Sequence, residues 1–390
     1  EFSRNMNTDS VEASLQVEPA TPVAYEWQEN SLTILPELRW QAGEEIEVFL
    51  SGDARSRLGL SVKERSWSYS VEGALVVYLW PNNEPANLYA LDLESGETRQ
   101  LTQFPEGLND YSVHPEGLGI YYCRASEPGS GQVGYWDRKT GSTQPVVNLQ
   151  QPCTHVEISP GGTQLAYGSI PGGGVSLLPL IDGGRISRVP VGQVFDFTWR
   201  TEESLSLLST VDDMLWLYAT GSQRLISIPS ISENIGNWSP DGDTYITNEL
   251  IDISTDFVPA GVASHLVTYS IGDQVWTDLT PEPALEDHEP VFSPGGETIA
   301  FTRKSLEEDE WTLGRQIWRM RADGSAAQQL TDLPDIIHNN LNFSPDGDIL
   351  IFLRFDQQSI TDPPELWMME LDDREQTRLV IGAYRPGWLP

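Results

Sequence analysis

Short apolar runs separated by turn residues fill most of this chain, in a pattern typical of β-strands. Seven runs rich in β-branched and aromatic residues each predict one strand: 74–79, 119–123, 164–168, 204–208, 243–247, 298–302 and 349–353. No stretch of 12 or more residues follows the period of an α-helix. The pattern therefore predicts an all-β protein.

A turn motif, Ser-Pro-Asp-Gly or a variant of it, precedes most of these strands. Clear copies lie at 238–242, 292–296 and 343–347, and weaker ones at 113–117 and 158–162. Pro, Asp and Gly are the residues that reverse a chain. The apolar or aromatic residue before the turn, here called the anchor, recurs at positions 40, 69, 113, 158, 199, 238, 292, 343 and 388. Seven of the eight intervals between anchors are 39–54 residues long. A supersecondary unit repeated at this spacing indicates a repeat architecture.

Two further strands complete each unit, as at 317–320 and 328–331. Four short antiparallel strands per repeat are typical of one blade of a β-propeller, which leaves only short, protected sheet edges. Complete units run from about 66 to 382, so we expect seven blades. The strand 384–390 is expected to close the ring beside the N-terminal region. The alternative is an eight-bladed ring in which 31–66 and the terminal strand form a degenerate blade.

Residues 1–30 are polar and show little periodicity, which predicts a flexible linker ahead of a single propeller domain over 31–390. No apolar run approaches the 18 residues of a membrane-spanning helix, so we expect no membrane insertion.

The chain is strongly acidic, with 23 Lys and Arg against 58 Asp and Glu and a formal net charge of −35. Nucleic acids and anionic membrane surfaces are bound by cations, so this charge argues against both as partners. Cationic partners and divalent metals remain compatible with it. Solubility alone also explains such a charge.

The two cysteines, Cys123 and Cys153, fall in adjacent predicted blades. A disulfide between them is geometrically reasonable. Two free, buried thiols are the favoured interpretation, because cysteine commonly behaves as a small apolar residue.

The segment 292–331 joins the turn motif to Ile-Trp-Arg-Met, Asp-Gly and a closing Leu-Thr. In this order of motifs the chain resembles the TolB-like, or WD-repeat-like, β-propeller family over roughly 66–390. The resemblance implies an extracytoplasmic bacterial location, in the periplasm, outside the cell or at its surface, and a role in protein binding. The namesake carries an extra α/β domain that we do not expect here, so its specific partners are not carried over. We expect a monomer, and a lipid anchor ahead of residue 1 stays open.

Polar residues just ahead of the anchors are expected at the mouth of the central channel, as a candidate binding site. They are Asp110, His155, Asp196, Asn234, Asp287, His288, His338 and Asn339. Three of them are histidines four to six residues before a motif serine, in slots that we interpret as equivalent. Imidazoles and carboxylates from different blades suit a divalent cation, and pectate-type lyases that resemble this propeller hold a central metal. A hydrated channel mouth without metal is the favoured interpretation, so no cofactor is expected.

Long acidic inserts connect the second and third strands of the last three complete units. They supply a second candidate contact surface, with Asp256, Glu308, Asp309 and Trp311, because loops on a rigid scaffold commonly carry binding residues. The Asp-Gly-Asp fragments at 241–243 and 346–348 supply too few oxygen ligands for calcium and are interpreted as turns.

The sequence therefore predicts a non-catalytic β-propeller that binds another protein. The alternative is a polysaccharide-binding or lyase-like propeller with a metal at the channel. Serine hydrolase chemistry is not expected, because the chain contains no Gly-x-Ser-x-Gly motif.

Overall fold

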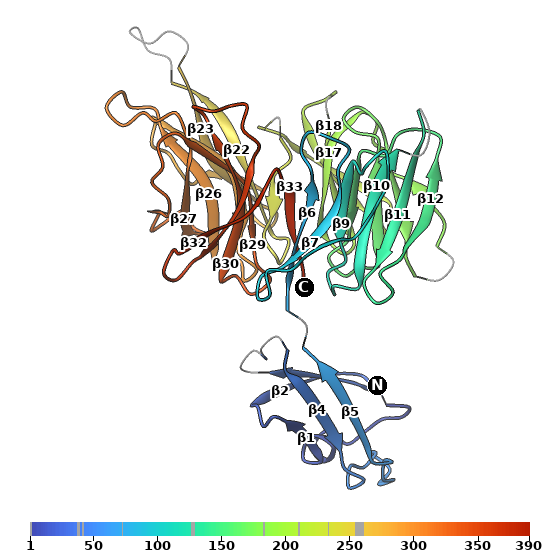
Figure 1. Ribbon diagram of the computed structural model, residues 1–390. Coiled ribbons are helices and arrows are strands. Elements are labelled where there is room, and N and C mark those ends of the chain that lie inside the picture. Colours follow the sequence, from blue (N-terminus) through green and yellow to red (C-terminus); the bar gives the residue numbers. More distant parts are fainter. Residues whose placement is uncertain are drawn as a thin grey trace. The chain divides into compact units, whose positions relative to one another are not determined.

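The computed structural model of the chain describes residues 2–36, 40, 43–71, 73–125, 129–181, 184–209, 211–232, 234–253 and 261–390. The chain divides into two compact units, Glu1–Ala74 and Leu75–Pro390 (Figure 1).

The smaller unit is a β structure with one short helix. In chain order it contains α1 (Thr8–Glu12), β1 (Leu15–Glu18), β2 (Val23–Gln28), β3 (Ser31–Pro36), β4 (Glu45–Leu50) and β5 (Arg65–Ser70). One sheet has the order β1-β4-β5, and β2 pairs with β3 as a hairpin. All strand pairs here are antiparallel.

The prediction of a flexible linker over 1–30 is wrong, because this segment helps to build the core of the smaller unit. Met6 and Val11 are buried with Leu50 and Ala54, and Trp27 packs against this cluster. Asn7 caps α1 by accepting a hydrogen bond from the Ser10 amide. The single domain predicted over 31–390 is likewise corrected, since 31–74 belongs to the smaller unit.

The larger unit is made of antiparallel four-stranded arrangements that follow one another along the chain. The first contains β33 (Tyr384–Leu389), β6 (Leu75–Trp80), β7 (Asn87–Asp92) and β8 (Thr98–Gln100). The next three sheets contain β9 (Asp110–Val113), β10 (Gly119–Ala125), β11 (Gly131–Asp137) and β12 (Thr143–Leu149); β13 (His155–Ile158), β14 (Gln164–Gly168), β15 (Val175–Pro179) and β16 (Ser187–Arg188); and β17 (Val194–Thr201), β18 (Ser204–Ser209), β19 (Met214–Ala219) and β20 (Arg224–Pro229).

Two further groups of four strands are joined into one eight-stranded sheet. They are β21 (Asn237–Trp238), β22 (Thr244–Asp252), β23 (Val262–Ser270) and β24 (Val275–Asp278), and then β25 (Leu285–Phe292), β26 (Thr298–Ser305), β27 (Gln316–Arg321) and β28 (Gln328–Gln329). The link is a single parallel pairing of Ser264 with Glu286. The last sheet contains β29 (Ile336–Phe343), β30 (Ile349–Asp356), β31 (Glu365–Glu370) and β32 (Gln376–Ile381).

The C-terminal strand β33 completes the first sheet of this unit, as expected for a closing strand. Trp388 pairs with Val76, and its side chain is buried. The strand therefore does not join residues 31–66, which the eight-bladed alternative requires.

The turn motifs have the structure that the sequence predicts. In the copy at 343–347, the Ser344 carbonyl accepts from the Gly347 amide at 2.8 Å, and the Ser344 hydroxyl accepts from the Ile349 amide at 2.9 Å. Gly347 has a φ of 82°, a left-handed conformation that glycine adopts without a steric cost. The Asp-Gly-Asp fragments are thus turns.

Apolar side chains fill the space between neighbouring sheets. Val77 and Leu88 of the first sheet pack in one cluster with Ile120, Tyr122 and Trp136 of the next. Each sheet buries both faces in this way, because its neighbours cover them.

Candidate functional site

Six polar residues lie three residues before the anchors of their blades. They are Asp110, His155, Asp196, Glu289, Asn340 and Arg385, and we call them the inner ring. The seventh residue at this offset is Ile235. All six lie in the strand that begins the four-stranded order of their blade, namely β9, β13, β17, β25, β29 or β33. In a propeller this strand faces the central channel.

Three members of the inner ring are aimed by β-bulges. Glu289, Asn340 and Arg385 have φ values of 51°, 54° and 48°, in the left-handed region that side chains rarely adopt. The strand register shifts around each of them. A bulge redirects a side chain, and such strained residues cluster at functional sites.

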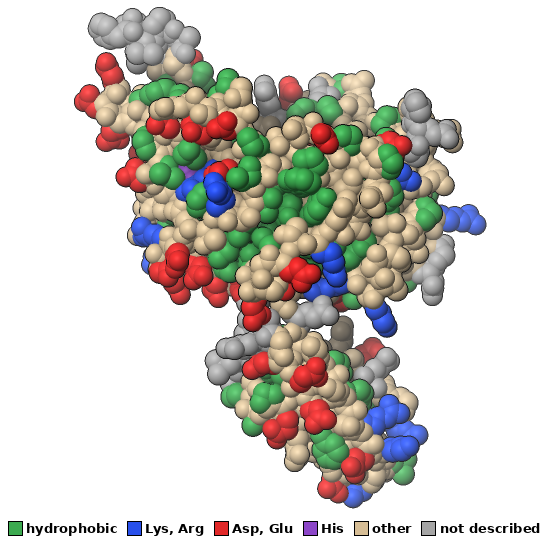
Figure 2. All heavy atoms as spheres, in the orientation of Figure 1, with side chains coloured by type: hydrophobic (Ala, Val, Ile, Leu, Met, Phe, Trp, Pro, Cys, Tyr) green, Lys and Arg blue, Asp and Glu red, His purple; other side chains and the backbone are tan. Residues whose placement is uncertain are grey.

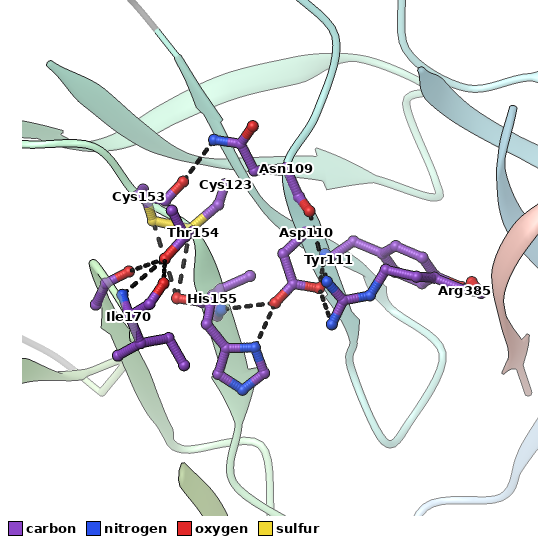
Figure 3. The surroundings of a disulfide bond; sticks show 11 residues. Asn109, Asp110, Tyr111, Cys123, Cys153, Thr154, His155, Ile170 and Arg385 are labelled. Atoms are coloured by element: carbon purple, nitrogen blue, oxygen red, sulfur yellow. Dashed lines mark hydrogen bonds and ion pairs between the residues drawn. A yellow bond between two sulfur atoms is a disulfide. The ribbon is translucent and has the colours of Figure 1, made fainter. Parts of the chain in front are cut away.

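Asp110 is the most highly bonded residue of the inner ring and is 1% exposed. Its carboxylate lies 2.7 Å from His155 Nδ1 and 3.0 Å from the Arg385 guanidinium. It also accepts hydrogen bonds from the amides of Tyr111 and Val156. Figure 3 shows the His155 ring and the Arg385 side chain converging on this carboxylate from opposite sides.

His155 is surrounded by carboxylates. Its Nε2 atom lies 3.7 Å from Asp196 and 4.0 Å from Glu157. Burial opposes protonation, but the hydrogen bond and charge of Asp110, with the other two carboxylates, outweigh it and raise the pKa of His155 to about 9. His155 is therefore an imidazolium at neutral pH and has no lone pair with which to act as a general base.

The pKa values of two acids beside His155 are also raised. Burial raises the pKa of Glu157 to about 7, although His155 and a hydrogen bond from Thr198 lower it. Burial also raises the pKa of Asp196. Perturbed acids and bases gathered in one place are typical of functional sites.

The other side of the inner ring borders a cavity of about 410 Å³. Asn340 and Arg385 line it, together with Tyr111, Asn342 and Trp388. The Asn340 amide donates to the Glu289 carboxylate at 2.5 Å. Burial raises the pKa of Glu289. The cavity therefore offers hydrogen-bonding groups and one cation, Arg385, whose side chain is 41% exposed.

A disulfide between Cys123 and Cys153 lies beside the Asp110–His155 pair (Figure 3). The bond joins β10 to the segment just before β13, and the Asn109 side chain donates to the Cys153 carbonyl at 2.6 Å. The favoured prediction of two free thiols is therefore wrong. Both cysteines are buried as predicted, but their Cα atoms lie 5.3 Å apart, within the range that a disulfide spans.

Two of the three predicted histidines occupy equivalent positions in the strand register, because the bulge in β25 adds one residue to the count. His155 and His288 pair with Gly168 and Thr302, each three residues after the residue that pairs with the anchor. His338 lies one position further from its anchor, opposite Arg354. His288 lies 3.5 Å from Glu286, whose carboxylate also pairs with Arg315. His338 is 1% exposed, and its Nδ1 atom lies 2.7 Å from the Arg315 carbonyl. Burial lowers the pKa of His338 to about 4, so this ring is neutral.

The remaining predicted channel residues lie outside the inner ring. Asp287 is fully buried and forms a two-bond ion pair with Arg303, at 2.7 and 2.8 Å. Asn234 is exposed ahead of β21, and Asn339 lies in β29 next to Asn340. Within the described ranges, no three His, Cys, Asp or Glu side chains form a group that could hold a metal ion.

The second and third strands of the late blades are joined by the predicted inserts. Glu308 and Asp309 are exposed, and Trp311 is 51% exposed with the Lys304 ammonium 4.3 Å from its ring. Asp256 lies outside the described residues. Arg315, the last residue of the insert 305–315, pairs with Glu286 of its own blade, and its carbonyl contacts His338 of the next blade.

Sequence reasoning missed Glu289, Arg385 and Glu157 as members or neighbours of this site. An equal offset from the anchor would have identified the first two. Glu157 lies one residue before its anchor, and a strand there directs it to the same side as His155.

No family model matches the sequence. Among curated proteins, the chain is 26% identical over 156 residues to an uncharacterized protein of Agrobacterium fabrum, over 38% of this chain. The match covers 45% of that relative, so the chain spans under half of its length.

Among solved structures, TolB from Acinetobacter baumannii matches with a TM-score of 0.50 at 12% identity, over 90% of this chain and 81% of that one. The larger unit has a β-propeller fold like that of this TolB. This propeller also resembles a periplasmic gluconolactonase of Pseudomonas aeruginosa, with a TM-score of 0.53 at 13% identity over 81% and 99% of the two chains. Identities this low show that the TolB-like propeller shares a fold with these proteins, and nothing of their chemistry. In the described part of the chain, no helix is long and apolar enough to cross a membrane.

Proposed function

We propose that this chain is a non-catalytic binding module outside the cytoplasm, and that it takes a protein partner on one face of a seven-bladed propeller. In this count β21–β24 and β25–β28 are separate blades that share one hydrogen-bonded sheet. The proposed contact surface, called the insert face, consists of the β22–β23, β26–β27 and β30–β31 connections of three successive blades.

Exposed apolar side chains on the insert face carry this proposal. Leu250 and Val262 flank the first connection, Trp311 and Leu313 lie in the second, and Ile360 lies in the third. Ile360 is 81% exposed. Large apolar side chains gathered on the loops of an otherwise acidic, soluble surface are typical of protein interaction sites.

We infer that the insert face and the inner ring lie at the same end of the propeller. Strands within a blade are antiparallel, so every connection from the second to the third strand emerges where the first strand begins. The contact of Arg315 with Glu286 and His338 agrees with this placement. A partner on the insert face therefore also reaches the channel mouth.

The charges of this end favour a partner with basic and apolar residues. Glu308 and Asp309 are exposed on the second insert, and Asp362 is exposed on the third. Complementary charge increases the rate of association and orients the partner. In this proposal His155 contributes to binding rather than removing a proton, because it is protonated and paired with Asp110.

The disulfide supports a location outside the cytoplasm. Disulfides such as Cys123–Cys153 persist in oxidising compartments and are rare in the cytosol of most organisms. Of the proteins with this fold, the gluconolactonase of Pseudomonas aeruginosa is periplasmic by name.

Affinity capture from envelope extracts of the source organism tests the proposal. The baits are the wild-type chain, a Trp311→Ala/Ile360→Ser variant and a Val275→Ser control, whose residue is also exposed but begins β24. We expect one protein to be recovered by the wild type and the control and to be lost with the double variant. Equal recovery with all three baits contradicts the use of the insert face. Turnover of a substrate by the purified chain contradicts the non-catalytic role.

A further inference from the structure

The smaller unit exposes an aromatic strand at the edge of its sheet. In the order β1-β4-β5, one edge of β5 has no neighbouring strand among the described residues. All six residues of β5 are exposed. Proteins usually protect such an edge with proline, a bulge or a covering segment, because its free amides and carbonyls can pair with another chain.

One face of β5 continues the apolar layer of the sheet without a cover. Tyr69, Trp67 and Arg65 stand opposite Ile46, Val48 and Leu50 in the register of β4 and β5. Opposite residues share a face, and the three β4 residues are buried. Trp67 and Tyr69 nevertheless remain 37% and 56% exposed. The core of this unit thus covers β4 and stops short of β5.

A cavity of about 420 Å³ adjoins this face of β5. Phe2, Met6, Leu50 and Trp67 supply its apolar lining. Three cations, Arg4, Lys63 and Arg65, also line it, and all three are exposed. Figure 2 shows Lys and Arg side chains gathered on one side of the smaller unit.

Among the residues that the structure describes, no carboxylate forms an ion pair with Arg4, Lys63 or Arg65, the cations of this cavity. Elsewhere the chain has an excess of acidic residues, and its net charge is −35. Three neighbouring cations left unpaired in such a chain are complementary to an anionic ligand.

We propose that β5 and this cavity bind an extended, acidic peptide segment of a partner, which adds to the sheet as a further antiparallel or parallel strand. The peptide's backbone pairs with the free edge of β5. Its apolar side chains cover Trp67 and Tyr69, and its carboxylates meet Arg4, Lys63 and Arg65. This surface is independent of the insert face and has the opposite charge.

Fluorescence anisotropy with the full chain tests the proposal. The probe is a fluorescein-labelled peptide in which Glu and Val alternate over eight residues. We expect saturable binding that weakens as salt is added, at least tenfold weaker binding to Arg65→Glu, and less than a threefold change for Arg57→Glu. Arg57 is an exposed cation of the connection between β4 and β5. It does not line the cavity, so it is a matched control for charge. Equal losses for the two variants overturn the proposal.

Modified peptides separate strand pairing from simple charge attraction. Two versions carry N-methyl groups on one or the other alternate set of backbone amides. We expect one version to lose binding and the other to keep it, because only alternate amides face β5. Retention by both versions, or binding of a peptide with Lys in place of Glu, overturns the proposal.

The same series of binding measurements can reveal two other occupants of β5 and its cavity. Binding of phosphatidylglycerol vesicles in an Arg65-dependent manner, with no binding of the peptide, identifies a lipid surface and overturns it. Self-association that Arg65→Glu abolishes and the peptide does not inhibit identifies a second copy of the chain and also overturns it. The Trp311→Ala/Ile360→Ser variant is expected to bind the peptide normally, so this test is separate from that of the insert face.

Discussion

The Arg385 guanidinium lies 3.0 Å from the Asp110 carboxylate, so the closing strand β33 is tied to the strand β9 of the next blade. The same carboxylate receives His155 from the blade beyond. One buried acid therefore links three neighbouring blades at the centre of the propeller.

Replacement of Asp110 by Asn is expected to destabilise the propeller by about 3 kcal/mol. The change leaves the cations of Arg385 and His155 without the carboxylate that they share, and breaking one side of a buried charge pair has a large cost. Urea titration followed by Trp fluorescence measures the loss. Asp362→Asn, at an exposed residue of the β30–β31 connection, is the matched control and should change stability by less than about 0.5 kcal/mol. A small effect at Asp110 would mean that solvent already screens this cluster.

The pKa of His155 predicts a stability that falls as pH rises above neutrality. The folded-state pKa of about 9 lies above the ordinary 6.5, so the folded chain holds the extra proton between these values. The stabilisation is complete below pH 6.5 and is lost as pH rises through 9, by about 3 kcal/mol in all.

Unfolding free energies measured between pH 7 and 9.5 check this slope. Glu157, whose pKa is raised to about 7, still titrates at the lower end of this window, so the slope above about pH 8 is the part that reports on His155. The His155→Gln variant should have a flatter profile than the wild type. Parallel profiles for the two proteins would contradict the assignment.

Removal of the disulfide by Cys123→Ala/Cys153→Ala is expected to lower the free energy of unfolding by about 3 kcal/mol. The bond closes a loop with a sequence separation of 30, and a cross-link of this length restricts the unfolded chain by about that amount. The wild type in excess reductant should unfold at the same urea concentration as the double variant. Protein from the native compartment should resist thiol alkylation until it is reduced, and ready alkylation would count against the disulfide.

Truncation of two tryptophans is expected to lower the free energy of unfolding by very different amounts. Trp388→Ala should cost about 3–5 kcal/mol, because its ring is buried in the closing blade and its Nε1 atom donates to the Asn342 carbonyl. Trp311→Ala should cost less than about 1 kcal/mol, since the ring is half exposed and its contact with Lys304 lies at the surface. Thermal unfolding of both variants measures the difference, and similar losses would mean that Trp311 is structural.

Local turn chemistry made the propeller predictable from the sequence. Residues such as Pro345 and Gly347 determine a chain reversal by themselves, and a repeated reversal implies a repeated blade. The pairing of β33 with the first blade followed from the same repeat. The smaller unit had no such signal. The anchors assigned at 40 and 69 belong to it rather than to a blade, and its core combines residues as distant as Met6 and Leu50.

Residues of the candidate site were predicted by counting back from the anchor. This count agrees with the strand register for Asp110, His155 and Asp196, because β9, β13 and β17 have no bulge between these residues and the anchor. In β25 and β29 a bulge inserts one extra residue, Glu289 or Asn340, and the count did not locate it. A bulge depends on contacts with the neighbouring strand, and a count along one strand does not reveal it.

The position of β33 also sets an order of events during synthesis. The strand β6 leaves the ribosome before every other strand of the propeller, and its partner β33 leaves after them all. Until β33 has been synthesised, the edge of β6 that pairs with it is unpaired, and the ring of blades is open. Pairing of the first blade with its innermost strand therefore has to wait for the last strand of the unit, whatever the order in which the blades between them fold.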